Sequence, residues 1–134
     1  EKYHWERPPQ RVFPVVEKLI AAYKLWHGYQ KLFPKETKYT LGEKIDRLFV
    51  ECVEATLTAV FLPKEHRRSF VHKAIIKLDT TNVFLRVAWE LASLDDKKYA
   101  ALSALLAEAG RQLGGWHNQL LKQNSAATNV VAEK

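Results

Sequence analysis

The sequence is poor in cysteine and has no long apolar run. Its 134 residues include one cysteine, Cys52, which excludes an intrachain disulfide framework and a cysteine-based zinc site. No stretch of 18 apolar residues is present, and no signal peptide opens the sequence. We therefore expect a soluble, cytoplasmic protein that does not associate with membranes.

Glycine and proline are also scarce, with five of each, and they fall mostly between segments of helical periodicity. In these segments apolar residues recur at steps of three and four, which is typical of amphipathic helices. Four such segments joined by short turns predict an all-α fold, an up-down-up-down antiparallel four-helix bundle. The predicted organisation is an N-terminal arm over 1–11, the four-helix bundle over 12–123 and a disordered tail over 124–134.

Local signals indicate where the helices begin and end. Thr40, with Glu43 three residues later, predicts a capping box in front of the second helix. The third helix is predicted to run from about residue 64 to residue 92. The other markers are Pro14 in a first helical turn, Pro63 at the end of the second helix, and Asp95 or Asp96 as N-cap of the fourth.

The third predicted helix is apolar around most of its circumference. Even its most polar row contains Ile76 and Val83, although a bundle helix normally needs one buried stripe. The fourth predicted helix carries a ridge of small side chains that includes Gly110 and Gly114, and glycine inside a helix costs about 1 kcal/mol relative to alanine. Close approach of another helix would offset that cost. These four residues are therefore candidates for an oligomer interface, with burial inside the bundle as the alternative.

Enzyme signatures are sparse. A di-metal carboxylate bundle needs Glu-x-x-His pairs on facing helices, and this spacing occurs only at Glu1 and His4 in the arm. Gly-rich phosphate loops, zinc protease motifs and serine elbows are absent. We therefore expect no enzymatic activity, no metal and no cofactor.

One short enzymatic pattern is present twice. Arg67 with His72, and Arg111 with His117, match the Arg-x(4–6)-His spacing of small helical ribonucleases of the HEPN group. Residues five or six apart do not share one helix face, so we interpret these side chains as surface or interface residues. A metal-independent ribonuclease that uses Arg67 and His72 is the alternative.

The net charge is +6, and basic residues concentrate at the start of the third predicted helix. This basic patch comprises Lys64, Arg67, Arg68, Lys73 and Lys77, together with His72. No base-reading scaffold accompanies these residues, so we interpret the patch as a surface that contacts RNA or DNA through phosphates. A solvated surface without a ligand is the alternative. The next most positive segment is the arm with the first helix, which carries Lys2, Arg7, Arg11, Lys18 and Lys24.

Several motifs carry a family resemblance. They are Phe-Pro-Lys-Glu at 33–36, Tyr-Thr-Leu-Gly-Glu-Lys-Ile at 39–45, Lys-Leu-Asp at 77–79, Phe-Leu-Arg at 84–86 and Glu-Ala-Gly-Arg-Gln-Leu-Gly-Gly-Trp at 108–116. In these motifs the sequence resembles the accessory variability determinant (Avd) family, the helper proteins of the reverse transcriptase in diversity-generating retroelements.

The resemblance implies a homopentamer of four-helix bundles that binds the reverse transcriptase and nucleic acid, either template RNA or cDNA. It also implies a role in mutagenic reverse transcription without catalytic activity of its own. A sister family, encoded in intervening sequences of bacterial large-subunit ribosomal RNA, shares the bundle but usually lacks the ending at 108–116. A structural role of that kind is a further alternative.

The resemblance and the helical periodicity lead to specific expectations for Asn82, Arg86 and Trp116. Asn82 stands where many Avd relatives carry arginine before the Phe-Leu-Arg run, so Arg86 is the basic contact that the resemblance retains. Asn82 falls on the predicted seam of the third helix, where a buried amide would set the register or bond across the bundle. That seam consists of Val71, Ile75, Leu78, Asn82, Leu85, Trp89 and Ala92. Trp116 lies on the seam of the fourth helix beside two glycines, and we expect it to be a buried packing anchor.

Overall fold

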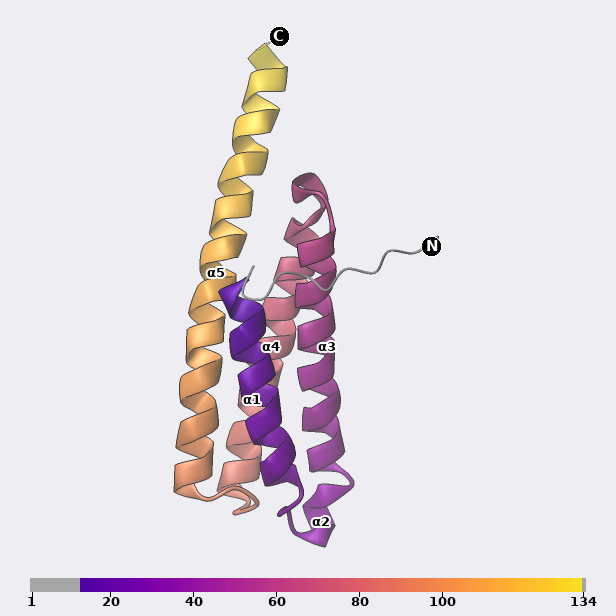
Figure 1. Ribbon diagram of the computed structural model, residues 1–134, viewed down its shortest axis with the longest axis vertical. Coiled ribbons are helices and arrows are strands. Elements are labelled where there is room, and N and C mark those ends of the chain that lie inside the picture. Colours follow the sequence, from indigo (N-terminus) through magenta and orange to yellow (C-terminus); the bar gives the residue numbers. More distant parts are fainter. Residues whose placement is uncertain (1–12, 134) are drawn as a thin grey trace, which may run out of the picture.

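A computed structural model describes residues 13–133, with side chains up to residue 125. In this range the chain forms four long helices, α1 (Pro14–Gln30), α3 (Leu41–Phe61), α4 (Arg68–Glu90) and α5 (Asp96–Glu133), and two short ones, α2 (Lys35–Lys38) and the 3-10 turn η1 (Lys64–His66). Successive long helices run antiparallel (Figure 1), which confirms the predicted up-down-up-down four-helix bundle. The predicted arm at 1–11 lies outside the described residues.

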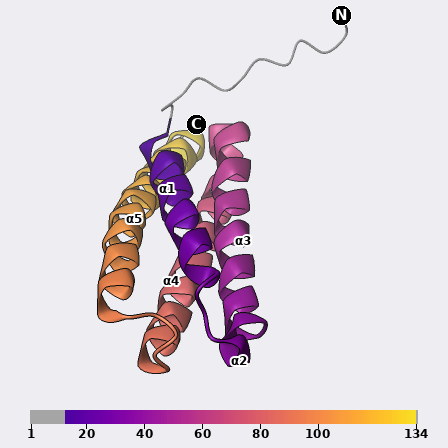
Figure 2. The ribbon, with the colours of Figure 1, turned by 60° about the horizontal axis from the view of Figure 1, so that its bottom comes forward.

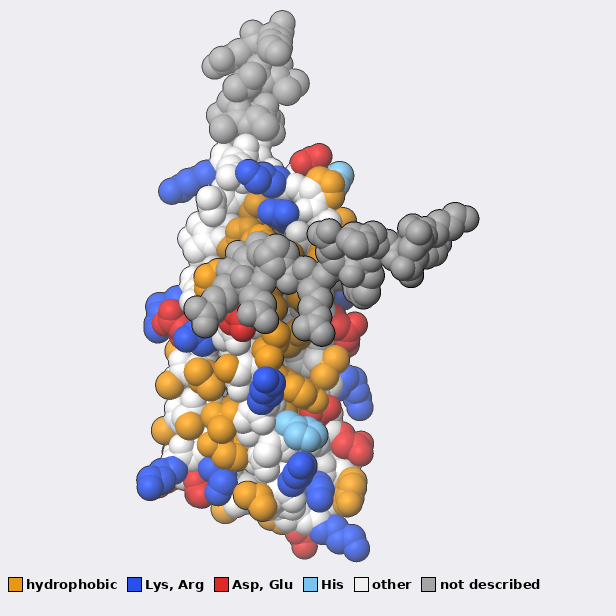
Figure 3. All heavy atoms as spheres, in the orientation of Figure 1, with side chains coloured by type: hydrophobic (Ala, Val, Ile, Leu, Met, Phe, Trp, Pro, Cys, Tyr) orange, Lys and Arg blue, Asp and Glu red, His pale blue; other side chains and the backbone are white. Residues whose placement is uncertain are grey.

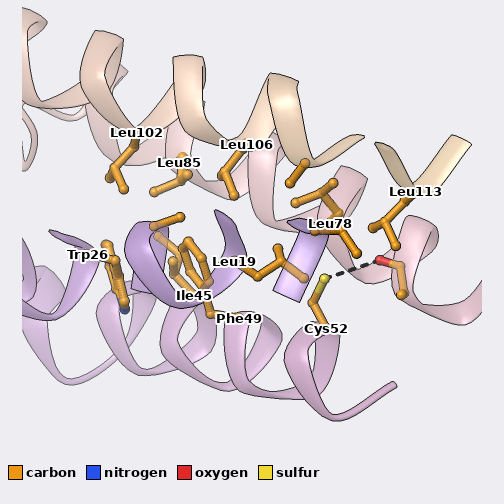
Figure 4. Packing of buried hydrophobic residues seen from close by; sticks show 14 of the residues in the cluster. Leu19, Trp26, Ile45, Phe49, Cys52, Leu78, Leu85, Leu102, Leu106 and Leu113 are labelled. Atoms are coloured by element: carbon orange, nitrogen blue, oxygen red, sulfur yellow. Dashed lines mark hydrogen bonds between the residues drawn. The ribbon is translucent and has the colours of Figure 1, made fainter. Parts of the chain in front are cut away.

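The long helices surround one apolar core. Helix α3 packs against α4, α4 against α5, α5 against α1, and α1 against α3, so each helix has two neighbours (Figure 2). Every long helix contributes residues that are excluded from water, such as Leu19, Ile45, Leu85 and Leu106 (Figure 4). Burial of these apolar side chains is the main force that holds the four helices together.

Two of the three predicted N-terminal signals are confirmed. Pro14 occupies the first turn of α1, and the Asp95 carboxylate accepts a 2.8 Å hydrogen bond from the Lys98 backbone N–H at the start of α5. The predicted capping box is wrong, because the Thr40 hydroxyl instead donates to the Glu36 carbonyl at 3.3 Å. The reason is the short helix α2, which ends directly before α3. Its terminal carbonyls lack partners within the helix, and one of them accepts the hydrogen bond from the Thr40 hydroxyl.

The predicted third helix is interrupted at its start and ends earlier than expected. Residues 64–66 form η1, and α4 runs only to Glu90. Ala92 has a left-handed backbone with φ of 63°, and the Ser93 N–H donates to the Ala88 carbonyl at 2.8 Å. Ala92 therefore closes the helix in a left-handed C-terminal turn, and it is not the seam residue that its spacing predicted.

The buried face of α4 is rotated relative to the predicted seam. Ala74, Thr81 and Ala88 are buried, whereas Asn82 is only partly buried and Trp89 is 37% exposed. Small side chains at the buried positions let α4 approach its neighbours closely, which leaves the larger aromatic ring at the margin. The prediction that Asn82 is a core amide is therefore wrong.

Helix α5 extends well beyond the other helices (Figure 1). Its backbone remains helical to Glu133, through most of the segment for which the sequence predicted a disordered tail. No glycine or proline follows Gly115, so no residue in that segment interrupts a helix. None of the helices in the described range is long and apolar enough to cross a lipid bilayer.

Candidate functional site

The basic patch predicted from the sequence is divided between two faces of the bundle. On the α3 side, the Lys77 ammonium lies 3.5 Å from a carboxylate oxygen of Glu51. Lys73 lies on the same side and borders a hollow of about 190 Å³ that Glu51 and Glu54 also line. The acidic side chains of α3 therefore offset part of the positive charge of these two lysines.

Arg67 is engaged by the backbone at the end of α3. Its Nε donates to the Leu62 carbonyl at 2.7 Å, and its Nη2 donates to the Val60 carbonyl at 3.1 Å. These carbonyls lack partners within α3 because the helix ends there, and the negative end of the helix dipole favours a cation. Arg67 thus holds the turn between α3 and α4, a role that the sequence analysis did not identify.

Arg68 and His72 are exposed on α4, and His72 faces α5. Its imidazole lies 5.6 Å from that of His117, measured between ring centroids. The structure therefore brings together the histidines of the two Arg-x(4–6)-His segments. It does not bring the arginines to them, because Arg67 bonds to the end of α3 and Arg111 pairs with Glu108.

Arg86 lies further along α4 and is exposed. Its Nε donates to the Glu90 carboxylate at 3.1 Å, an ion pair between residues one helical turn apart. Such exposed pairs contribute little to stability, so the pair leaves Arg86 available for an exchange of partners.

Three cationic residues converge on a pocket of about 520 Å³ between the start of α1, η1 and α5. They are Lys64, Arg67 and Arg111. The remaining walls come from α1 and α5, and they consist of Phe13, Pro14, Val15, Gln112, Gly115, Trp116, Gln119, Leu120 and Gln123. Figure 3 shows Lys and Arg side chains beside apolar ones at the upper end of the bundle, around α5 and the turn that follows α3.

Trp116 forms part of this pocket. Its ring packs on Phe13 with centroids 5.2 Å apart and an angle of 39° between the ring planes. The indole is only partly buried and lies at the edge of the core. The predicted buried anchor is thus a wall of the pocket, because the opening between α1, η1 and α5 leaves part of the ring uncovered.

Gln112 also lines the pocket, and one of its amide atoms lacks a partner. Its Nε2 donates to Glu108 at 3.3 Å, which fixes the orientation of the amide. Its Oε1 is buried and accepts no hydrogen bond within the described part of the chain. Unsatisfied buried acceptors are rare in folded proteins, and each one carries a free-energy cost.

The sequence analysis missed this pocket, although a signal for it exists. Residues 112, 116, 119 and 123 follow one another at steps of four, three and four, which places them on one face of a helix. That α1 and η1 close the other side depends on tertiary structure, which spacing within one helix does not reveal.

The predicted interface residues differ in their surroundings. Ile76 is 50% exposed and Val83 is 61% exposed, both on the outer face of α4. A Cβ added to Gly110 would lie 3.5 Å from a methyl group of Leu78, so this glycine faces α4 within the chain. A Cβ at Gly114 would have no neighbour within 4 Å, so that position is open. Their place in an oligomer stays a prediction.

Comparison with models of protein families gives a match over most of the chain. The model of a protein family described as bAvd-like matches residues 13–120. This range includes α1, α3 and α4 in full and α5 as far as Leu120. No curated protein matched the chain.

Proposed function

Because the chain belongs to the bAvd-like family, we propose that it acts in a diversity-generating retroelement as a non-enzymatic accessory protein of the reverse transcriptase. In this role it binds the reverse transcriptase together with template RNA or cDNA, and it supports the mutagenic copying of a target gene. The family match carries the proposal, since it covers residues 13–120, with parts of all four long helices, and includes the motif at 108–116.

The surface of the bundle supports the nucleic-acid part of this function. Lys64, Arg68 and Lys73 are exposed near the η1 end, and Arg86 is exposed further along α4. Cations on a helical scaffold without a base-reading element contact phosphates, so binding depends on charge more than on sequence.

The outer face of α4 supports self-association. Ile76 and Val83 are exposed aliphatic side chains at a spacing of seven residues, which places them on one stripe of the helix. We propose that this stripe and the open position at Gly114 form the contacts of a homo-oligomer, a pentamer as the family resemblance implies.

Co-purification tests the proposed partner most directly. The chain is co-expressed with a candidate reverse transcriptase from a diversity-generating retroelement, and the tagged enzyme is purified in moderate salt. We expect the chain to co-elute with that enzyme. A reverse transcriptase from an unrelated type of retroelement is the control, and the chain should not co-elute with it. Absence from both eluates would contradict the proposal, as would a gene position inside a ribosomal RNA operon.

A further inference from the structure

We propose that the pocket beside Trp116 binds one unstacked base of a single-stranded nucleic acid, with the adjacent phosphates on Lys64 and Arg111. The identity of the ligand rests on the proposed function, whereas the position of the site rests on the pocket itself. The binding mode differs from phosphate contact along α4 because it requires a free base.

The size and the walls of the pocket fit a base. Its volume of about 520 Å³ lies within the range of small-molecule sites in proteins. The partly exposed indole of Trp116 and the ring of Phe13 supply aromatic surface, and the Arg67 guanidinium lies 5.8 Å from the Phe13 centroid. Aromatic rings and guanidinium groups are the surfaces on which proteins stack unpaired bases.

The charge of the pocket fits a nucleotide. Lys64, Arg67 and Arg111 line it, and none of the lining residues in the described part of the chain is acidic. Lys64 is exposed and forms no ion pair within the described residues, so its ammonium is available for a phosphate. Arg111 is paired with Glu108 and is also well exposed, so a phosphate can replace that carboxylate.

Gly115 keeps the pocket open and offers a way to close it. The residue is exposed within α5, borders the pocket, and a Cβ added to it would have no neighbour within 4 Å. Leucine at this position favours the helix and occupies pocket volume without disturbing the core. Gly28 in α1 is a matched control, because it is also exposed, has no neighbour within 4 Å and is not among the residues that line the pocket.

The experiment compares Gly115→Leu with Gly28→Leu and the wild type in the full chain. The probe is a fluorescein-labelled eight-nucleotide RNA of mixed sequence, either single-stranded or annealed to its complement. Dissociation constants are measured over a range of salt concentrations. Circular dichroism and light scattering establish that the three proteins share the same helicity and assembly state.

We expect Gly115→Leu to weaken binding of the single strand about tenfold, because stacking of one base contributes about that factor or more. The slope against salt should stay unchanged, since no phosphate contact is removed. Duplex binding should be unaffected, and Gly28→Leu should behave as the wild type. A second variant, Trp116→Phe, should weaken single-strand binding two- to fivefold because its ring is smaller.

Two outcomes would overturn the proposal, and they are distinguishable. If Gly115→Leu and Trp116→Phe bind the single strand as tightly as the wild type, the pocket is not a base site, while the phosphate surface of the proposed function stands. If the wild type binds neither form of RNA at low salt, the nucleic-acid role itself fails, and the pocket proposal fails with it.

Discussion

The imidazole rings of His72 on α4 and His117 on α5 lie side by side, with centroids 5.6 Å apart and ring planes inclined at 36°. The arginines that precede them in sequence are engaged elsewhere. Arg67 donates to the carbonyls at the end of α3, and Arg111 pairs with Glu108. The two histidines are therefore adjacent, but neither Arg67 nor Arg111 is bonded to them.

This arrangement predicts that the protein does not cleave RNA. Wild type and His72→Ala should both leave a labelled RNA intact after prolonged incubation in EDTA, as judged by denaturing gel electrophoresis. A ribonuclease of the Arg-x(4–6)-His type would need its arginine positioned beside the histidine to stabilise the charge that develops in the transition state. Metal-independent cleavage by the wild type that disappears in His72→Ala would instead establish the ribonuclease alternative.

The two tryptophans in the described helices α1 and α5 should differ in their contribution to stability. Trp26 is fully buried, and its Nε1 donates to Asp46 at 3.1 Å, so Trp26→Ala should cost about 3–5 kcal/mol. Trp116 is only partly buried, so its removal leaves no closed cavity in the core. Trp116→Ala should therefore cost only about 1–2 kcal/mol. Urea unfolding followed by circular dichroism measures both. Equal losses would show that Trp116 is a core residue after all.

The single thiol should be unreactive in the folded protein. Burial is the main reason that the pKa of Cys52 is raised to about 12, and the carboxylate of Asp79 adds to this shift. At pH 8 only about one thiol in 10⁴ is then ionised, and a thiol reagent also needs access to the core. Labelling with a disulfide reagent should therefore follow global unfolding and accelerate with urea.

The pH dependence of stability follows from the same shift. The folded state favours the neutral thiol. The contribution of Cys52 to the free energy of unfolding is therefore fully present below pH 9 and is lost as pH rises toward 12. Complete labelling of native protein within minutes at pH 8 would contradict the buried position of Cys52.

The fold could be predicted from the sequence more completely than the site. The four helices were predictable because their apolar residues repeat at steps of three and four over long segments. The buried face of α4 was not, because Ala74 and Ala88 are small, and hydrophobicity alone favours the larger Ile75 and Trp89. Which side chains are buried there depends on how closely the neighbouring helices approach, and this is a property of the packed bundle.

The predicted site was limited in a similar way. Spacing along α4 placed Arg67 among phosphate contacts, but its hydrogen bonds go to α3, a helix that precedes it in the chain. The pocket beside Trp116 combines residues about a hundred positions apart, such as Phe13 and Gln112. No motif within one helix encodes such a combination.

The exposed stripe on α4 should mediate self-association. Replacing Ile76 and Val83 together with aspartate introduces charge where apolar surface would be buried between copies, so the molar mass in light scattering should fall to that of a single chain. Ile20→Asp on α1, where the residue is 39% exposed, is the control and should leave the assembly intact. A wild type that is monomeric at micromolar concentration would contradict the predicted oligomer.

The salt dependence of RNA binding tests the central claim most directly. For about five phosphate contacts on a single strand, log Kd plotted against log salt should have a slope of about 3.5, and loss of three contacts should reduce it to about 1.4. The test variant combines Lys64→Ala, Arg68→Ala and Lys73→Ala. The control variant removes the same charge from the exposed Lys31, Lys35 and Lys97 and should retain the steep slope. An affinity that does not change with salt, or equal slopes for both variants, would contradict a phosphate-binding surface at the η1 end of the bundle.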